Sequence, residues 1–385
     1  MTTFRMPTAS LMPGPLRHVP VGRPLARDDR QRPHALQPIS ARRHRPVSTT
    51  ASHRCGAGSS ATCRQRVDER CCEVLEVIRS KSPYATVVVV PGNPGISEFY
   101  RDYLMHLAER LPSSYNLLCH GYVGHGAQDQ HRGQLFTLRD QVQNHLAFVE
   151  AIDGAVILVG HSIGCHICLE AKTSMPNKVI AVVGLQPFLW PNAESSEQRR
   201  IAGMVGIGPL CVLVAALGSL VSLLPARIMD WVRTNIFLGA WNQSLHAADI
   251  TGRYCFRYQL LRNVFHMGLT EFKDLASPAC AARSRAATLA PYQAQLAMLF
   301  NEDDHWAPLS AKAELEEVLP GMATFVEERP GEKPWPHDFV TTAPASAHFA
   351  RRTAEVLAQL LGDALPTCTS GGSTTAAAPS ARETT

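Results

Sequence analysis

The chain has 385 residues, 45% of them hydrophobic, which suffices for one large globular domain with additions or for two domains. Its formal net charge of +4 is unevenly placed, because residues 1–67 carry twelve arginines and only two acidic residues, Asp28 and Asp29. The rest of the chain is therefore mildly acidic. This charge argues against a phosphate-binding surface, so we expect no nucleic-acid partner.

Residues 1–75 form a basic extension rich in Arg, Ser and Pro. Such a composition buries too little apolar surface to fold, so we expect the extension to be disordered. It also fits an organelle transit peptide that would direct the chain to a plastid, and an extension without a targeting role fits equally well. Residues 364–385 are of low complexity and are expected to form a second disordered tail.

Between these ends, over residues 83–363, short apolar runs alternate with segments of helical periodicity such as 103–111 and 142–152. The expected strands are Val87–Val90, Leu117–His120, Val156–Val159, Val179–Leu185, Leu296–Phe300 and Thr324–Glu327. This alternation predicts an α/β fold, a mostly parallel sheet with helices on both faces. Residues 190–265 contain helical patterns without strands, so we expect a helical insertion, or lid, above the sheet.

The strongest functional signal is the pentapeptide GHSIG at Gly160–Gly164. A buried strand leads into it and a helix follows at once, which is the context that a G-x-S-x-G nucleophile elbow requires. Its two glycines would let neighbouring backbone pass close by. Ser162 would then stand in a tight turn at a helix N-terminus, where developing negative charge is favoured. We expect Ser162 to be the nucleophile of an α/β-hydrolase fold.

A serine hydroxyl becomes a good nucleophile when a base takes its proton and a carboxylate orients that base. In this fold the acid and then the histidine follow the serine along the chain. Asp304 lies in the loop after the expected strand Leu296–Phe300 and is the candidate acid. Asp303 and Glu302, one and two residues away, remain alternatives.

Several histidines compete for the role of base. His337 follows the last expected strand in a loop, where a base would hang over the elbow, and it is the expected base. His305 adjoins the acid and would have difficulty bridging acid and serine, while His348 falls in an expected C-terminal helix. His120 and His125 precede the serine and break the expected order.

An acyl-transfer site also needs two N–H donors directed at the oxyanion. One is the backbone N–H of the residue after the nucleophile, Ile163, and the other comes from the loop after the third strand. The stretch Pro91–Gly95 is the expected loop. Because Pro94 has no N–H, Asn93 is the expected second donor, with Gly95 as the alternative.

Three stretches together resemble the lipid droplet-associated hydrolase family of the α/β-hydrolase superfamily. They are PGNPG at Pro91–Gly95, GHSIG at Gly160–Gly164 and DDHW at Asp303–Trp306. The similarity covers about residues 85–360, which is nearly the whole part of the chain expected to fold.

Carried over by position, this resemblance implies Ser162 as the nucleophile, Asp304 as the acid and His337 as the base. These are the residues already selected on chemical grounds. The resemblance also implies association with lipid droplets or the endoplasmic reticulum.

The stretch Ile201–Ala226 contains no charged residue and by length is a candidate for a transmembrane segment. A single crossing would place Ser162 on one side of the membrane and both Asp304 and His337 on the other. We therefore expect the stretch to re-enter, to lie in the interface or to fold over the site as a lid. Arginines flank it on both sides, which suits an interfacial anchor: Arg199, Arg200 and Arg227. A buried lid helix in a soluble enzyme is the alternative.

The predicted function is a serine hydrolase of lipid carboxylic esters, of the sterol ester or acylglycerol type, acting through an acyl-enzyme on Ser162. The predicted mechanism needs no metal or organic cofactor. The alternative is a weakly active or inactive adaptor that binds lipid surfaces on a hydrolase scaffold.

Overall fold

The computed structural model describes residues 53–54, 62–127, 131, 133–192, 194–275, 286–329 and 331–362. All of these lie in one compact unit, Pro46–Thr385. The expected disorder of most of the N-terminal extension and of the tail 364–385 falls outside the described residues.

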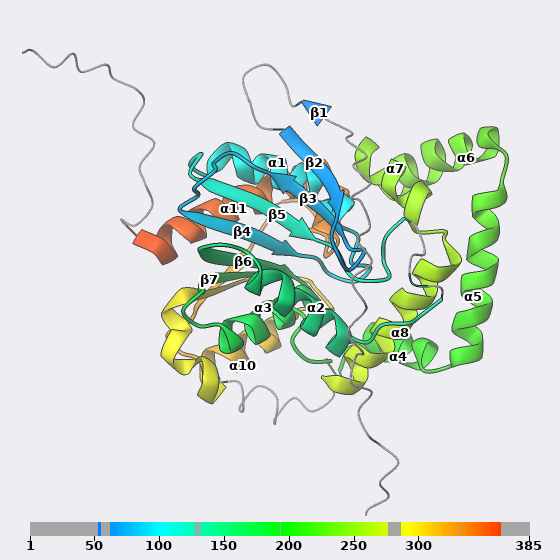
Figure 1. Cartoon of the computed structure of the whole chain (residues 1–385). Coiled ribbons are helices and arrows are strands. Elements are labelled where there is room, and N and C mark those ends of the chain that lie inside the picture. Colours follow the sequence, from blue (N-terminus) through cyan, green and yellow to red (C-terminus); the bar gives the residue numbers. More distant parts are fainter. Residues whose placement is uncertain are drawn as a thin grey trace, which may run out of the picture. The chain divides into compact units, whose positions relative to one another are not determined.

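A nine-stranded sheet forms the centre of this unit, with the strand order β1-β2-β3-β5-β4-β6-β7-β8-β9 (Figure 1). The strands are β1 His53–Arg54, β2 Thr62–Val67, β3 Glu73–Val77, β4 Ala85–Val90, β5 Tyr115–His120, β6 Ala155–His161, β7 Val179–Leu185, β8 Leu296–Asn301 and β9 Ala323–Glu327. The pairs from β5 through β9 are all parallel, whereas β1, β2 and β3 join by antiparallel pairing. All six expected strands are present, so the prediction of a mostly parallel sheet is confirmed.

The expectation that residues 1–75 are disordered is wrong for residues 53–54, which form β1, and for residues 62–75. The latter part forms β2 and most of β3, and β3 pairs with β5 so that Leu75 lies opposite Cys119. Both of those side chains are fully buried. Strand β3 could not be recognised from the arginine-rich composition of the extension. Its apolar residues become buried only by pairing with β5, more than 40 residues away. The folded domain therefore begins before residue 62, not at 83.

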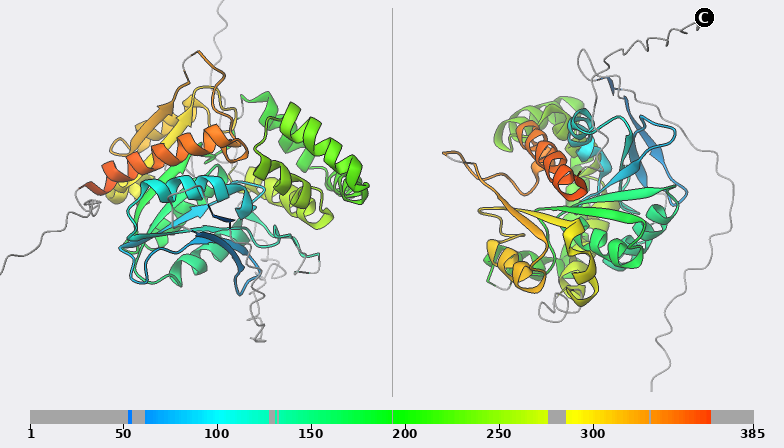
Figure 2. Two further views of the ribbon diagram at one scale, coloured as in Figure 1. Left: turned by 90° about the horizontal axis from the view of Figure 1, so that it is seen from above. Right: turned by 90° about the vertical axis from the view of Figure 1, so that its left-hand side faces the viewer.

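Some helices cover both faces of the sheet, and others form the insertion between β7 and β8. They are η1 Ser97–Tyr100, α1 Arg101–Arg110, α2 Leu138–Glu150, α3 Ile163–Ser174, α4 Ser196–Val205, α5 Gly208–Leu220, η2 Val221–Leu223, α6 Ala226–Val232, η3 Arg233–Ala240, α7 Leu245–Tyr254, α8 Tyr258–Asp274, η4 Ala290–Gln295, α10 Leu309–Val318, η5 Phe339–Thr341 and α11 Ala343–Leu361. Figures 1 and 2 show α1 beside α11 on one face, and α2, α3 and α10 on the other.

The valine run of β4 is explained by this layering. Val87 and Val89 belong to the core beneath α1 and α11, while Val88 and Val90 belong to the core beneath α2, α3 and α10. All four are at most 1% exposed. A central parallel strand is buried on both faces, so it carries no alternation of apolar and polar residues.

The first helix of the insertion expected over residues 190–265 is α4, which begins at Ser196, and the predicted end at residue 265 is wrong. That residue lies inside α8, which continues without a break to Asp274. The helix keeps one packing face along its whole length, with Leu260, Met267 and Glu271 buried, so nothing in it marks a boundary at 265.

No single helix among the described residues is long and apolar enough to cross a membrane. Only α4 and the helical run Gly208–Leu223 together reach the required length and hydropathy, and they are bent by 89° at the break between them. The break is short and includes Gly206, and α5 starts with a proline in its first turn. The apolar stretch 201–226 is therefore a bent pair of helices.

Candidate active site

The serine at the end of β6 occupies a strained turn. Ser162 has φ 53° and ψ −122°, and α3 begins at the next residue. A non-glycine residue in such a conformation costs on the order of 1–3 kcal/mol. A Cβ at Gly160 would lie 2.6 Å from the Cα of Cys165, and one at Gly164 would clash with the Val90 carbonyl oxygen. Both glycines are thus required by close backbone approach, as the elbow pattern predicts.

The structure brings the three predicted catalytic side chains together. His337 Nε2 lies 2.9 Å from Ser162 Oγ, and His337 Nδ1 lies 2.7 Å from Asp304 Oδ2. Since a carboxylate only accepts, Nδ1 carries the proton and the lone pair of Nε2 faces the serine hydroxyl. The alternative acids Asp303 and Glu302 are exposed, whereas Asp304 is buried.

Asp304 is held in its ionised form. Its Oδ1 accepts hydrogen bonds from the backbone amides of Trp306 at 2.8 Å and Ala307 at 3.3 Å. Burial alone would raise the pKa of this carboxyl. The hydrogen bond and charge of His337, together with the two amides, outweigh burial and lower the pKa below its ordinary value. The carboxylate can therefore orient the imidazole at neutral pH.

The other histidines considered as the base make contacts elsewhere or are exposed. His348 Nε2 lies 2.7 Å from Glu327 Oε2, and His120 Nε2 lies 2.9 Å from a carboxylate oxygen of Asp68. His305 is exposed. His125 donates from Nδ1 to the Pro94 carbonyl oxygen at 2.5 Å and so supports the loop after β4.

That loop, Pro91–Gly95, passes directly beside the serine. A Cβ at Gly92 would lie 3.0 Å from the Cβ of Ser162. The Gly92 N–H donates to the Tyr100 hydroxyl at 2.8 Å, and the Gly95 N–H donates to the Gly92 carbonyl oxygen at 2.6 Å. Gly95 N–H is therefore occupied within the loop.

Two backbone N–H groups close to the serine remain available. The Asn93 N–H makes no hydrogen bond within the described part of the chain. Ile163 is the first residue of α3, so the helix itself does not use its N–H. This geometry is compatible with the predicted oxyanion site of Asn93 and Ile163, and their roles stay predictions.

A second hydrogen-bonded chain, which the sequence did not predict, runs through the buried side chains of Tyr100 and His161 next to the site. The Tyr100 hydroxyl lies 2.6 Å from His161 Nδ1, and His161 Nε2 lies 2.8 Å from the His337 carbonyl oxygen. Because the Tyr100 oxygen already accepts the Gly92 N–H, its own proton points to Nδ1, which leaves Nε2–H to donate to His337. Burial, followed by the nearby His337, lowers the pKa of His161 to about 3, so this ring is neutral.

This chain links the loop Pro91–Gly95, named the oxyanion loop for its predicted role, to the backbone of the predicted base His337. The only sequence signals were a histidine directly before the nucleophile and a tyrosine shortly after the loop. Neither residue type alone indicates a position in three dimensions.

One cluster of metal-type ligands occurs among the described residues. Asp68, Cys72 and His120 place their ligand atoms within 4.8 Å of one another. Asp68 already accepts hydrogen bonds from His120 and from the backbone amides of Arg70 and Cys72. Burial raises the pKa of the Cys72 thiol well above its ordinary value, which favours the protonated form. These contacts account for the cluster as a cap on a turn.

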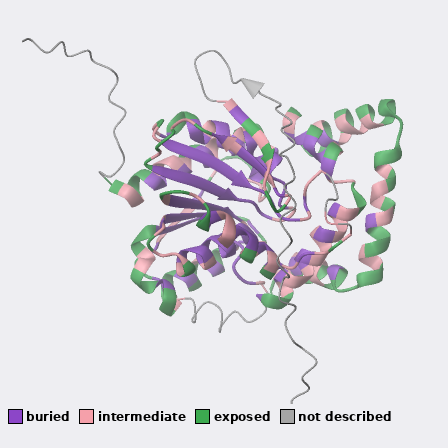
Figure 3. Ribbon diagram, in the orientation of Figure 1, coloured by how far each residue is buried: buried purple, intermediate pink, exposed green. Residues whose placement is uncertain are grey.

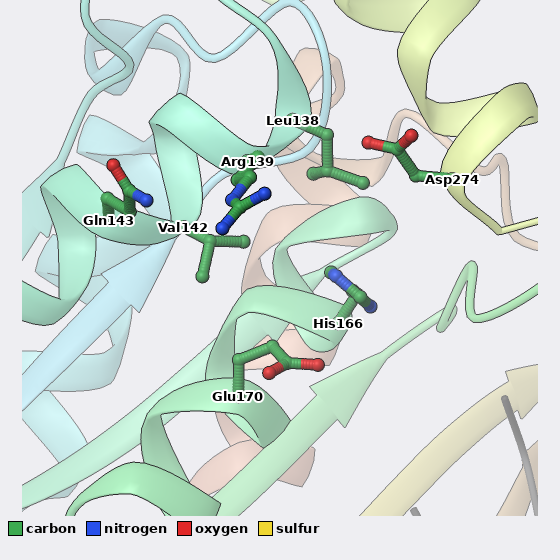
Figure 4. A pocket seen from close by; sticks show the side chains of 7 residues that line it. All are labelled: Leu138, Arg139, Val142, Gln143, His166, Glu170 and Asp274. Carbon is green, nitrogen blue, oxygen red and sulfur yellow. The ribbon is translucent and has the colours of Figure 1, made fainter. Parts of the chain in front are cut away.

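A cavity of about 320 Å³ lies between α2, α3 and the end of α8 (Figure 4). Arg139, His166, Glu170 and Asp274 contribute to its lining. None of Ser162, Asp304 and His337 reaches it, so this cavity is not the site where an ester would meet the serine.

A strained serine between a parallel strand and a helix, bonded through a histidine to an aspartate, defines an α/β-hydrolase. Solved structures agree. A carboxylesterase of the thaumarchaeon Nitrososphaera gargenis aligns with a TM-score of 0.50 at 16% identity, covering 77% of this chain and 97% of that one. A haloalkane dehalogenase variant from Bradyrhizobium elkanii aligns with a TM-score of 0.55 at 13% identity, covering 80% and 100%. At these identities the likeness shows the fold alone.

The family of lipid-droplet associated hydrolases matches residues 83–340, and the chain belongs to this family. The lipid droplet-associated hydrolase of Dictyostelium discoideum is 22% identical over 261 residues, which are 64% of this chain and 81% of that protein. The protein of the same name from Homo sapiens is 23% identical over 308 residues, 74% and 87% of the two chains. The predicted family and fold are thereby confirmed, and the chain is a member of a family of hydrolases.

Proposed function

We propose that the chain is a serine hydrolase of lipid carboxylic esters, of the sterol ester or acylglycerol type. It would act at the surface of a lipid droplet or of the endoplasmic reticulum. The observation that carries this proposal is the hydrogen-bonded series Ser162, His337 and Asp304 at a strained elbow. The names of its relatives support the lipid surface.

In the acylation step, Ser162 Oγ attacks the ester carbonyl carbon while its proton passes to His337 Nε2. The carbonyl oxygen becomes an oxyanion and accepts hydrogen bonds from the N–H groups of Ile163 and Asn93. Such a donor contributes on the order of 100- to 1,000-fold in rate. Asp304 holds the imidazole in place and stabilises the imidazolium that forms.

The tetrahedral intermediate then collapses. Its bond to the alcohol oxygen breaks, and that oxygen takes the proton from His337 Nε2, which releases the alcohol and leaves an acyl ester on Ser162. In the second half, His337 accepts a proton from water as the water oxygen attacks the acyl carbon. Ser162 leaves with that proton, and a carboxylic acid is released. The scheme uses only these side chains, two backbone amides and water.

We propose that the stretch 201–226 holds the enzyme at the lipid surface. In α5 only Ala215 is buried. Figure 3 shows this helix mostly in the colours of exposed and intermediate residues. The large exposed apolar residues of the stretch are Met204, Ile207, Val212, Leu213, Val214, Leu217, Leu220, Leu223 and Leu224. An exposed apolar area of this extent marks a binding surface. Trp231, 60% exposed on the following helix, extends it with a ring suited to a lipid–water interface.

Labelling with a fluorophosphonate probe tests the proposed chemistry. The wild type should be labelled and the folded Ser162→Ala variant should not. The unlabelled wild type should also release fatty acid from emulsions of cholesteryl oleate or trioleoylglycerol, and prior labelling should abolish this release. A folded wild type that stays unlabelled in the presence of phospholipid vesicles would contradict the proposal.

A second candidate is a lipid-surface adaptor with little or no turnover. The observation that favours it is the separation of the apolar face of α5 from the triad, since the two lie on different elements. Flotation with artificial droplets distinguishes the two. Binding of wild type and Ser162→Ala alike, without labelling or turnover by the wild type, would identify the adaptor.

A further inference from the structure

The insertion holds the oxyanion loop through the side chain of Asn93. Its Nδ2 donates to the Val264 carbonyl oxygen and to Glu271 Oε1, both at 3.1 Å. Both partners lie on α8. Because both are acceptors, the amide must turn its NH2 group towards α8. The Asn93 side chain is thus committed to the insertion, while its backbone N–H stays available beside Ser162.

Glu271 is an unusual residue for this position. Its side chain is buried, and in the described part of the chain its hydrogen-bond partner is the Asn93 amide alone. A buried carboxyl without a cation destabilises a fold unless its polar atoms are well paired. Burial raises the pKa of Glu271 to about 8, with the Asn93 bond acting in the opposite direction. An apolar residue would be buried here at a lower cost in folding free energy. The carboxyl of Glu271 is therefore better explained by its hydrogen bond to Asn93 in the loop Pro91–Gly95.

Helix α8 also contacts the apolar surface described above. It packs against α5 so closely that a Cβ at Gly218 would lie 2.9 Å from Leu261 Cδ1. Two turns further along the same helix, a Cβ at Gly268 would lie 3.7 Å from Asn93 Nδ2. Helix α8 therefore contacts both the exposed helix α5 and the oxyanion loop, and Figure 1 shows α8 next to α5.

We propose that Glu271 is a positioning residue of the active site. Through the Asn93 side chain it fixes the direction of the Asn93 N–H, so the oxyanion site is complete only while α8 is in place. The inference rests on the proposed serine hydrolase function. It adds that the insertion, besides facing lipid, supplies part of the support of the catalytic machinery.

The test uses hydrolysis of the soluble ester p-nitrophenyl butyrate, which separates chemistry from lipid binding. Glu271→Gln keeps the size and the acceptor oxygen and should stay within about 3-fold of the wild-type kcat. Glu271→Leu removes the acceptor and should lower kcat by about 10- to 100-fold with little change in KM, because a displaced donor weakens transition-state binding only. Thr270→Val is the matched control, since Thr270 bonds to Leu138 and not to the loop.

A double-mutant cycle keeps the proposal testable if Glu271→Leu proves unstable. Asn93→Ala retains the backbone N–H but loses the tie to α8, so it should show the same loss of kcat. Combined with Glu271→Leu it should lose no more than either single variant. Additive losses, or a folded Glu271→Leu variant with wild-type kcat, would overturn the inference. A wild type without labelling or turnover would instead overturn the proposed function.

Discussion

His161 Nε2 lies 2.8 Å from the backbone carbonyl oxygen of His337, so the residue before the proposed nucleophile holds the backbone of the proposed base. The ring receives its other hydrogen bond from Tyr100, which in turn accepts the Gly92 N–H. One buried chain thus joins the loop Pro91–Gly95, the elbow and the proposed base. Such a chain fixes three segments that are far apart in sequence in one arrangement.

Replacing Tyr100 with Phe removes the central member of this chain. The change leaves the Gly92 N–H and His161 Nδ1 without their partner, so we expect kcat to fall by about 3- to 10-fold, the equivalent of one neutral hydrogen bond. Steady-state hydrolysis of p-nitrophenyl butyrate measures it. Tyr103→Phe is the control, because Tyr103 is equally buried but bonds to Thr353, away from the site. Equal kcat values for the two variants would contradict the role of Tyr100.

Replacing Asp304 with Asn tests the acid. An asparagine has only one acceptor oxygen, so it cannot accept both from His337 Nδ1–H and from the backbone amides that now donate to Oδ1. Its NH2 group would face one of these donors, and the imidazole would turn or change tautomer. We expect kcat to fall by about 10,000-fold while the fold is kept. The exposed neighbour is the control, and Asp303→Asn should retain activity. A large loss in Asp303→Asn with an active Asp304→Asn would reassign the acid.

The pKa of Glu271 predicts a pH dependence of stability. Its folded pKa of about 8 is above the ordinary value of 4.5, so the folded state holds a proton that the unfolded state releases. The resulting stability is fully present below pH 4.5 and is lost as pH rises towards 8. The slope is about 1.4 kcal/mol per pH unit within that window.

Urea unfolding at pH 5, 6.5 and 8 measures this slope. Glu271→Gln should flatten it, because a glutamine does not titrate. Glu314→Gln, an exposed glutamate on α10, should leave it unchanged. If wild type and Glu271→Gln lose stability in parallel over this range, Glu271 is ionised in the folded protein.

The sequence was sufficient where the signal is local. The elbow is a short pattern whose glycines, serine and flanking strand and helix are contiguous, so Ser162 could be selected without a structure. Asp304 and His337 followed because chain order in this fold restricts the choice. The central strands were visible because burial on both faces leaves an uninterrupted apolar run.

The sequence was insufficient where a feature depends on contacts between distant residues. Strand β3 has only five residues and becomes buried by pairing with β5. The bond between Asn93 and Glu271 joins residues 178 positions apart. The apolar stretch 201–226 was visible from composition, but composition cannot distinguish a buried helix from an exposed one, or a straight helix from one bent by 89°.

The exposed face of α5 gives the last prediction. Leu213, Leu217 and Leu220 are each more than half exposed, so changing all three to Gln should alter the free energy of unfolding by little. If these leucines enter the lipid, each substitution removes on the order of 1.5–3 kcal/mol of binding free energy from apolar burial. Flotation with phospholipid-coated trioleoylglycerol droplets should then disappear. Hydrolysis of soluble p-nitrophenyl butyrate should persist. Ile78→Gln changes an equally exposed apolar residue outside the insertion, between β3 and β4, and should float like the wild type. Flotation of the triple variant at the wild-type level would show that another part of the chain holds the lipid surface.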